Sequence, residues 1–318
     1  MPSTPVSAQT GVAKISRMRR MTAAGVMCAR NEEVHIERVI EDTIAEGLDV
    51  VLIDNDSTDA TVPLARRFLG HGLLRIERLP WSGLFAMEGV LEAKRRVFET
   101  LDHDWVMHLD ADESASAPDE GVTLAEGLAE ADAAGASCVN FNEFVFVPGP
   151  GEDVYRKDHK RLLTRYYFLE PYRPRLWRAW RNHAGLDNRR YGGHQLTGGA
   201  RIYERSFPLR HYVALSEAHA RAKYLERTYS RAELDRGWHR GREMSSDSLE
   251  FPDDPQVRTL PHWASKQYDL SEPVRSHYWD WWREPPPHYG PVTRARGWAR
   301  RKLVTRYVTV PARPAGQP

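Results

Sequence analysis

The sequence of 318 residues predicts an α/β fold in which a Rossmann-like mixed sheet, largely parallel in its first half, is flanked by helices. Between residues 22 and 147, short apolar runs typical of strands alternate with segments of helical periodicity, the pattern of a parallel sheet covered on both faces. The length and the 41% of hydrophobic residues suffice for one full core and a small annex. Polar residues follow several of the apolar runs, so we expect a functional edge where strands end.

The elements of this half are predicted in order along the chain. Asn31 can cap a first helix, Val39 and Ile40 recur in it at near-helical spacing, and Gly47 ends it. Strands are expected at 25–29, 50–53, 73–76, 105–109 and 137–147. The remaining helices are expected at about 59–69, 84–100 and 120–133.

The second half predicts a less regular structure. Residues 148–191 are rich in Pro, Gly, Arg and aromatic residues, which favours an irregular insertion or lid over further sheet. Strands are expected again at 200–203 and 208–213, and Ser216 can cap a helix that runs to about residue 234. We therefore expect three parts: a disordered leader (1–21), a main domain (22–235) and a Trp-rich, basic C-terminal extension of irregular or helical structure (236–318).

Composition bounds the partners and the location. The formal net charge of +1 gives no general attraction to nucleic acid, although residues 276–318 carry seven Arg and one Lys against two acids. Cys28 and Cys138 lie in apolar runs and are expected to be reduced core residues, as in a cytoplasmic protein. No window approaches the ~20 apolar residues of a membrane span, and residues 1–21 lack the apolar stretch of a signal peptide. The Trp-rich, basic C-terminal part is open to three interpretations: core packing around its Trp residues, a platform for the acceptor, or peripheral contact with the anionic inner membrane face.

Carboxylates follow two of the expected strands. Asp110 and Asp112 close the run 105–109, and Asp54 closes the run 50–53. Such carboxylates can hold a hard divalent cation against a diphosphate. A dinucleotide fold or a nucleoside triphosphate loop would need glycines after the first strand, where this chain reads Cys28-Ala29-Arg30. A nucleotide held by strand ends and a metal is therefore the remaining interpretation.

Three motifs in this half together resemble the family 2 glycosyltransferases of the GT-A fold. The resemblance covers roughly residues 22–147, and its motifs are Arg30-Asn31-Glu32, Asp54-Asn55-Asp56-Ser57-Thr58-Asp59 and Asp110-Ala111-Asp112-Glu113. It implies a nucleoside diphosphate sugar donor, with Asp54 hydrogen-bonded to its base or ribose and the main chain at Ala29 and Arg30 lining the base pocket. It also implies Mn²⁺ or Mg²⁺ on Asp112, with Asp110 near the ribose or the water shell of the metal. The donor site expected from it comprises Ala29, Arg30, Glu32, Asp54, Asp56, Asp110, Ala111 and Asp112.

A looser resemblance extends into the second half through His211-Tyr212, Ser216 and Lys223. It implies a late histidine as the third metal ligand, for which His211 is the first choice and His194 the second. Lys223 and Arg227 lie one helical turn apart and either face the diphosphate or belong to a solvated helix face.

The proton acceptor is the open question of the sequence. An inverting transferase needs a carboxylate near the acceptor hydroxyl. Glu143 is the first candidate, because a strand position beside aromatic residues would raise its pKa, although strand alternation could instead turn it to solvent. Asp187 is the reserve candidate, and a retaining mechanism stays open.

The leading hypothesis is a metal-dependent hexosyl transfer from a nucleoside diphosphate sugar, with uridine or guanosine as the base, to a hydroxyl on a glycan, a lipid-linked molecule or a small molecule. Two alternatives remain: a non-catalytic module that binds nucleotide sugars or glycans, and a metal-dependent hydrolase of the activated sugar.

Overall fold

The computed structural model describes residues 21–171, 174–236, 238–239, 251–252, 256–278 and 307–312. In these ranges the strands are β1 (Ala23–Ala29), β2 (Asp49–Asp54), β3 (Leu73–Arg78), β4 (Trp105–Leu109), β5 (Glu113–Ala115), β6 (Cys138–Phe146), β7 (Arg165–Leu169), β8 (Leu176–Arg181), β9 (Ala200–Tyr203), β10 (Phe207–His211), β11 (Arg258–Thr259) and β12 (Tyr307–Val310). The α-helices are α1 (Ile36–Ala45), α2 (Thr61–Ala65), α3 (Met87–Glu99), α4 (Leu124–Ala133), α5 (His159–Leu162), α6 (Glu217–Ala220) and α7 (Arg231–Asp235).

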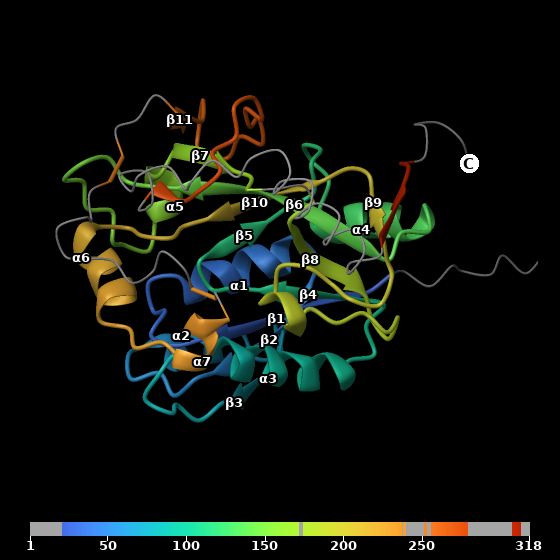
Figure 1. Ribbon diagram of the computed structural model, residues 1–318, viewed down its shortest axis with the longest axis horizontal. Helices are drawn as coiled ribbons and strands as arrows, with labels where there is room; N and C mark the ends of the chain where they lie inside the picture. Colours follow the sequence, from blue (N-terminus) through green and yellow to red (C-terminus); the bar gives the residue numbers. More distant parts are fainter. Residues whose placement is uncertain are drawn as a thin grey trace, which may run out of the picture.

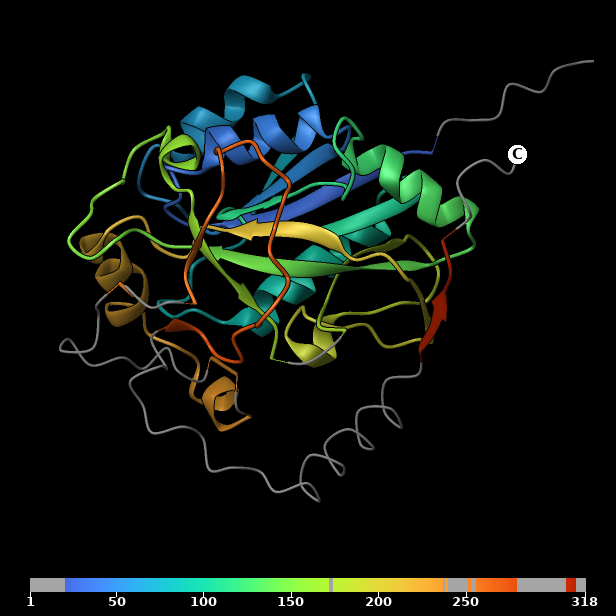
Figure 2. The same ribbon diagram turned by 90° about the horizontal axis from the view of Figure 1, so that it is seen from above.

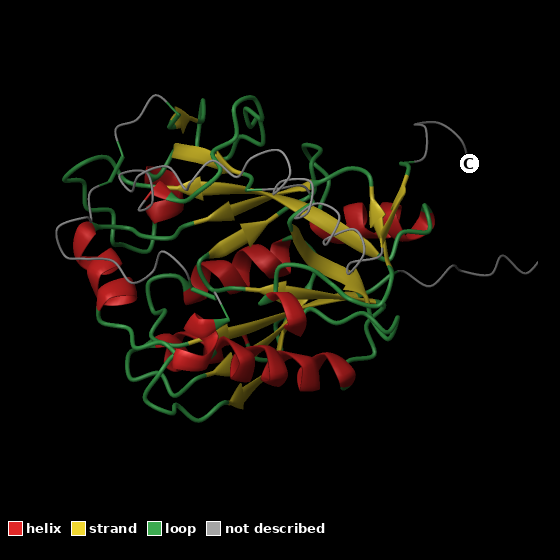
Figure 3. Ribbon diagram, viewed as in Figure 1, coloured by secondary structure: helices red, strands yellow, loops and turns green. Residues whose placement is uncertain are grey.

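The strands form one mixed sheet, with helices on its faces (Figures 1 and 3). Its main path runs β11-β7-β6-β8-β4-β1-β2-β3. The strands β3, β2, β1 and β4 are mutually parallel, whereas β8 is antiparallel to both β4 and β6. The predicted α/β class, a mixed sheet flanked by helices, is confirmed.

The period-two alternation of β1 supplies two separate cores, one on each face of the sheet. Met27 packs on one face with the apolar side of α1 and α4, including Ile40 and Leu128. Val26 packs on the other face against α3, including Val97. Figure 2 shows α1 and α4 on one side of the sheet and α3 on the other. Because helices cover both faces of the sheet, the side chains along the parallel strands are mostly apolar. Polar side chains that could bind a ligand are therefore expected where the strands end.

The expectation of an irregular insertion at 148–191 is wrong in part, because β7 and β8 lie inside this segment. Both strands pair with β6, and β8 separates β6 from β4. Their side chains are almost all buried, including Trp177 and Tyr167. The arginines that made this segment resemble a loop include Arg178, which is buried and paired with carboxylates.

Two predicted helix boundaries also differ. Asn31 has φ +54° and its side chain accepts a hydrogen bond from the Thr58 amide, so it belongs to a turn and not to the helix that begins at Ile36. Ser216 does cap a helix, since its hydroxyl accepts from the His219 amide. That helix is interrupted after a π turn at Arg221–Leu225, where the carbonyl of Thr228 accepts instead from the Phe85 amide.

The described parts of the expected C-terminal extension lie against the main sheet. The strand β11 pairs with β7, and β12 pairs with β9. The expected leader, apart from Met21, and the basic stretch 294–306 lie outside the described residues. Within the described part of the chain, no helix combines the length and the apolar character that crossing a bilayer requires.

Candidate functional site

A pocket lies where the parallel strands β1, β2 and β4 end. Residues at the ends of these strands or just after them line the pocket, including Ala29, Asn55 and Asp112. Its charged lining consists of Glu32, Asp110, Asp112, Glu143, Arg30, Arg175, Arg178, Lys223 and Arg227, with His194 and His211 beside them. Strand ends of a parallel sheet are the usual place of ligand sites in α/β proteins.

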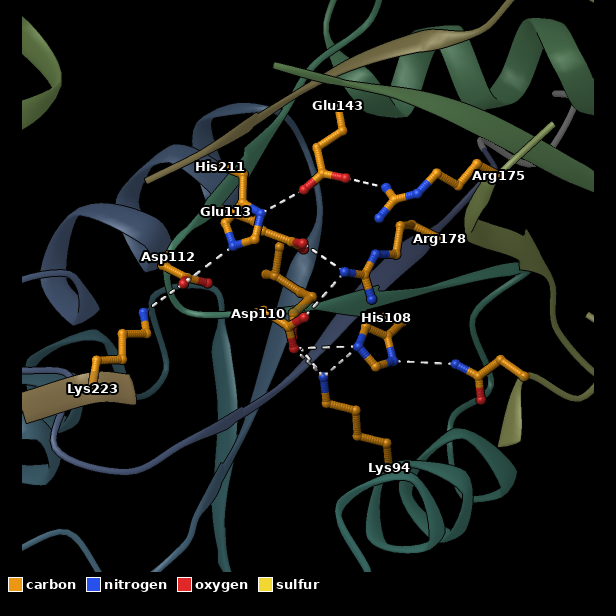
Figure 4. A network of polar contacts seen from close by, with 12 residues as sticks. Lys94, His108, Asp110, Asp112, Glu113, Glu143, Arg175, Arg178, His211 and Lys223 are labelled. Carbon is orange, nitrogen blue, oxygen red and sulfur yellow. Dashed lines mark hydrogen bonds and ion pairs between the residues drawn. The ribbon is translucent and has the colours of Figure 1, made fainter. Parts of the chain in front are cut away.

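Asp110 is held from below by a buried lysine. The Nζ atom of Lys94 lies 2.9 Å from Asp110 Oδ1 and donates to the carbonyl of Leu109 at 2.7 Å, and the Lys94 side chain is fully buried on α3. His108 Nε2 lies 3.2 Å from the same Oδ1 atom, and Arg178 donates to Oδ2 at 3.2 Å. Arg178 also donates to the buried Glu113 at 2.6 Å. Asp110 is thus surrounded by cationic and polar donors (Figure 4).

Asp112 belongs to a second chain of alternating charges. Lys223 donates to Asp112 Oδ2 at 2.6 Å, and His211 Nε2 lies 3.3 Å from the same oxygen. The other ring nitrogen of His211, Nδ1, lies 2.6 Å from Glu143, and Glu143 is paired in turn with Arg175. Figure 4 shows the carboxylates of Asp110 and Asp112 directed to these two different groups of partners.

Charge pairing sets the protonation states of this second chain. Burial acts to raise the pKa of Asp112, but the charges of Lys223 and His211 hold this pKa well below its usual range. Burial acts to lower the pKa of His211, yet the Asp112 and Glu143 carboxylates raise it well above the usual value. His211 is therefore an imidazolium that donates from both nitrogens.

The structure corrects the reasoning that selected Glu143. The side chain is buried within β6 and not turned to solvent. Burial acts to raise its pKa, but Arg175 and His211 outweigh burial and lower the pKa well below the usual value. In the sequence, Glu143 has aromatic residues as neighbours, and Arg175 reaches its carboxylate only in the folded chain. Asp187, the reserve candidate, is paired with Arg189 at 2.6 Å and is not part of the pocket lining.

The donors do not fit a divalent cation as they are arranged. Such a cation needs several oxygen ligands turned to one point. Asp110 and Asp112 instead face different cations, and both nitrogens of His211 face carboxylates. Among the described residues, no group of three or more His, Cys, Asp or Glu side chains is placed to hold a metal. The Oδ2 atom of Asp112 is already bound by the Lys223 ammonium.

The other residues expected at the donor site divide into two groups. Ala29, Arg30, Glu32 and Ala111 line the pocket together with Asp110 and Asp112. Asp54 is buried outside the lining, where its carboxylate accepts from the Ser57 amide at 3.2 Å.

Asp56 also lies outside the lining and acts on its shape. Its carboxylate is paired with Arg78 and accepts from the Trp81 amide at 2.9 Å. Trp81 is a pocket residue that the sequence argument missed, and the guanidinium of Arg30 lies 4.2 Å from the centre of its ring. An aromatic ring held beside a strand end offers a surface on which a nucleotide base can stack.

Arg175, Arg178 and Phe85 were also missed. The two arginines lie in the segment that was expected to be irregular. For Arg178 the signal would have been a cation between apolar residues of a buried strand, whereas Arg175 directly precedes that strand. Arg227 lies 4.7 Å above the centre of the Phe85 ring, so both members of the pair Lys223 and Arg227 line the pocket. His194, the second choice as a metal ligand, lines the pocket as well, and burial lowers its pKa well below the usual value.

Comparison with known proteins identifies the family. Residues 26–207 match the family described as Glycosyl transferase family 2, and this region is more than half of the 318 residues. The chain belongs to glycosyl transferase family 2. The predicted resemblance and the predicted enzyme class, a glycosyltransferase with a GT-A type α/β sheet, are thereby confirmed.

Individual relatives are similar over shorter stretches. An uncharacterized glycosyltransferase of Rickettsia typhi is 31% identical over 87 residues, which are 27% of this chain and 26% of the relative. One of Rickettsia prowazekii is 30% identical with the same coverage. The matched stretch thus spans about a quarter of these curated relatives.

Solved structures show the same partial likeness. S. aureus TarS in complex with UDP is 18% identical over 42% of this chain and 38% of its own, with a TM-score of 0.33. Glucosyl-3-phosphoglycerate synthase from Mycobacterium tuberculosis, crystallised with Mn²⁺, UDP and phosphoglyceric acid, is 26% identical over 30% and 34% of the two chains, with a TM-score of 0.23.

Proposed function

We propose that this protein transfers a sugar from a nucleoside diphosphate sugar to a hydroxyl group of a glycan, lipid or small-molecule acceptor. The observation that carries the proposal is the pocket at the strand ends, whose lining combines Asp110 and Asp112 with the cations Arg30, Lys223 and Arg227. A neutral ligand would gain little from these cations, whereas a diphosphate gains charge-assisted hydrogen bonds from them. Family membership supports the same reaction class.

The parts of the donor can be assigned to parts of the pocket. We place the base beside Trp81 and the main chain of Cys28 and Ala29, and the diphosphate toward Lys223 and Arg227. The acceptor oxygen attacks the anomeric carbon, and the bond from that carbon to the diphosphate oxygen breaks with its electron pair. The cationic side chains stabilise the negative charge that gathers on the leaving group. We propose a single displacement, which inverts the anomeric carbon.

The acceptor proton needs a base, and two carboxylates in the lining compete for this role. Burial raises the pKa of Glu32 to about 7, close to the pKa that suits a base at neutral pH. Glu143 has the opposite shift, because its pairs with Arg175 and His211 keep it an anion. We therefore assign proton acceptance to Glu32 and give Glu143, the residue preferred on sequence, the positioning of His211.

Ligand binding and turnover test the proposed function. Saturation with UDP or GDP at a hundredfold its Kd should stabilise the protein by about 2.7 kcal/mol, measured as a rise in melting temperature. Slow donor hydrolysis that an acceptor accelerates would indicate a transferase, and hydrolysis that no acceptor accelerates would indicate a hydrolase. The absence of a shift with any nucleoside diphosphate would contradict the donor site itself. The configuration of the product, measured by NMR, decides between inversion and retention.

A further inference from the structure

We propose that the Lys223 ammonium, held by Asp112, takes the place of a divalent cation at the diphosphate, so that this chain binds its donor without metal. The inference rests on the proposed function and goes beyond it. It assigns a chemical role to a side chain that the sequence interpretation left open between the site and a solvated helix face.

The position of Lys223 is that of a built site and not of a surface charge. Its Nζ atom lies 2.6 Å from Asp112 Oδ2 and 3.9 Å from Glu32 Oε1, and only 9% of its side chain is exposed. Lysine is seldom buried unless it is paired, so two carboxylates are the reason that it can lie here. Lys223 also belongs to the π turn Arg221–Leu225, and single π turns occur frequently at functional sites.

The balance of charge in the lining favours a diphosphate without metal. Four carboxylates are opposed by five permanent cations, which are Arg30, Arg175, Arg178, Lys223 and Arg227. A metal is needed where carboxylates alone would repel a diphosphate, and here the carboxylates are already neutralised by side chains of the same chain.

Lys223 and a divalent cation exclude each other at Asp112. Both would bind the same carboxylate, and an ammonium and a divalent cation held that close together repel each other. Removing the ammonium should therefore open Asp112 to a metal. The inference thus predicts that loss of Lys223 converts a metal-independent protein into one that responds to Mn²⁺.

The experiment measures UDP and GDP binding to the full chain by calorimetry, in EDTA and in Mn²⁺. For the wild-type protein we expect Kd values that agree within about twofold in the two buffers. Lys223→Met should weaken binding in EDTA by roughly ten- to a hundredfold, the value of a charge-assisted hydrogen bond. Mn²⁺ should restore part of this loss and should raise the melting temperature of the variant, but not that of the wild-type protein.

Two further variants separate charge from fold. Lys223→Arg keeps the cation and should stay closer to wild type than Lys223→Met. Arg221→Gln removes a cation from the same turn, where Arg221 is paired with Glu217 on the surface, and should leave Kd unchanged. If Lys223→Met does not fold, the wild-type comparison of EDTA with Mn²⁺ still decides the question.

The two proposals fail in different ways. Wild-type binding that requires Mn²⁺, or a folded Lys223→Met that binds normally in EDTA, would overturn the role of Lys223 and leave the donor site standing. If neither UDP nor GDP binds in either buffer, the proposed function fails and the role of Lys223 with it.

Discussion

The two halves of the chain bring opposite charges to the pocket. All four carboxylates of the lining lie before residue 147, and Glu32, Asp110 and Asp112 follow the ends of parallel strands. Four of the five permanent cations lie after residue 174, on or beside β8 and near the π turn that follows α6. The first half thus supplies the carboxylates at a regular sheet edge, and the second half supplies most of the cationic side chains of the pocket.

This difference shows why neither half is a site alone. Carboxylates gathered at one edge would repel one another and a diphosphate, and buried cations without partners would be costly. Packed together, they form the ion pairs Lys223–Asp112 and Arg178–Glu113 and leave a net positive lining. The chemistry therefore depends on the register between the halves, which the contacts of β8 and β10 with the first half set.

The largest effect expected from a residue of the first half is on turnover. Glu32→Gln removes the proposed proton acceptor and should lower kcat by about 10²–10⁴-fold, with a smaller effect on the Kd for UDP because Asp112 still holds Lys223. The rise of kcat near pH 7, expected from the pKa of about 7, should also be lost. Glu33→Gln is the matched control, because Glu33 accepts from the Ala60 amide outside the pocket. A normal kcat for Glu32→Gln would mean that another group accepts the proton, and Glu143→Gln would be the next variant to measure.

The largest effect expected from the second half is on stability. Arg178→Met leaves the buried Glu113 and the Asp110 carboxylate without their guanidinium and should lower the free energy of unfolding by about 3–5 kcal/mol. Arg181→Met, three residues along the same strand, removes an exposed pair with Asp132 and should cost only about 0–1 kcal/mol. Chemical denaturation of both variants measures the difference. If the two variants lost the same free energy of unfolding, the buried ion pairs between the two halves would matter no more for stability than an exposed pair.

The first half could be predicted from the sequence because its signals are local. An apolar run followed by acids, as at Asp110 and Asp112, predicts both the strand and the edge of the sheet at which it ends. The structure places Glu32 at the same edge. Asp54 shows the limit of this reasoning. It is the last residue of β2, but its carboxylate turns to the amide of Ser57. The spacing of residues in the sequence does not reveal whether such a carboxylate bonds to a nearby amide or faces the pocket.

The second half was harder to predict because its signals are long-range. Arg175 and Arg178 looked like loop residues, since a buried arginine is recognisable only when its partners Glu143 and Glu113 are known. For the same reason the expected rise in the pKa of Glu143 is wrong, because the charge of Arg175 contributes to lowering this pKa. Lys223 was noticed in the sequence, but only the folded chain brings it across 111 residues to Asp112.

The junction of the halves also carries a pH dependence. His35 of the first half packs against His159 of the second, with ring centres 4.7 Å apart, and burial lowers the pKa of His159 to about 4. Between the ordinary value of 6.5 and about 4, the unfolded chain takes up a proton that the folded chain refuses, so stability falls as the pH falls through this window. His159→Phe should reduce the slope by about 1.4 kcal/mol per pH unit, measured by denaturation at several pH values. An unchanged slope would contradict the buried neutral state, and His71→Gln at the exposed surface serves as control.

The smallest effect on stability is expected at the start of α4, which lies in the first half outside the pocket. The hydroxyl of Thr123 accepts from the Glu126 amide at the start of α4, and the Glu126 carboxylate accepts from the Thr123 amide, which closes a capping box. Thr123→Ala should lower the free energy of unfolding by about 1 kcal/mol, and Thr123→Ser should retain most of it. Since no residue of α4 lines the pocket, kcat and KM should not change. A change in KM together with this small loss of stability would show that α4, although it lies outside the pocket, also affects how the two halves of the chain are aligned. The contrast between the two halves would then not explain the site on its own.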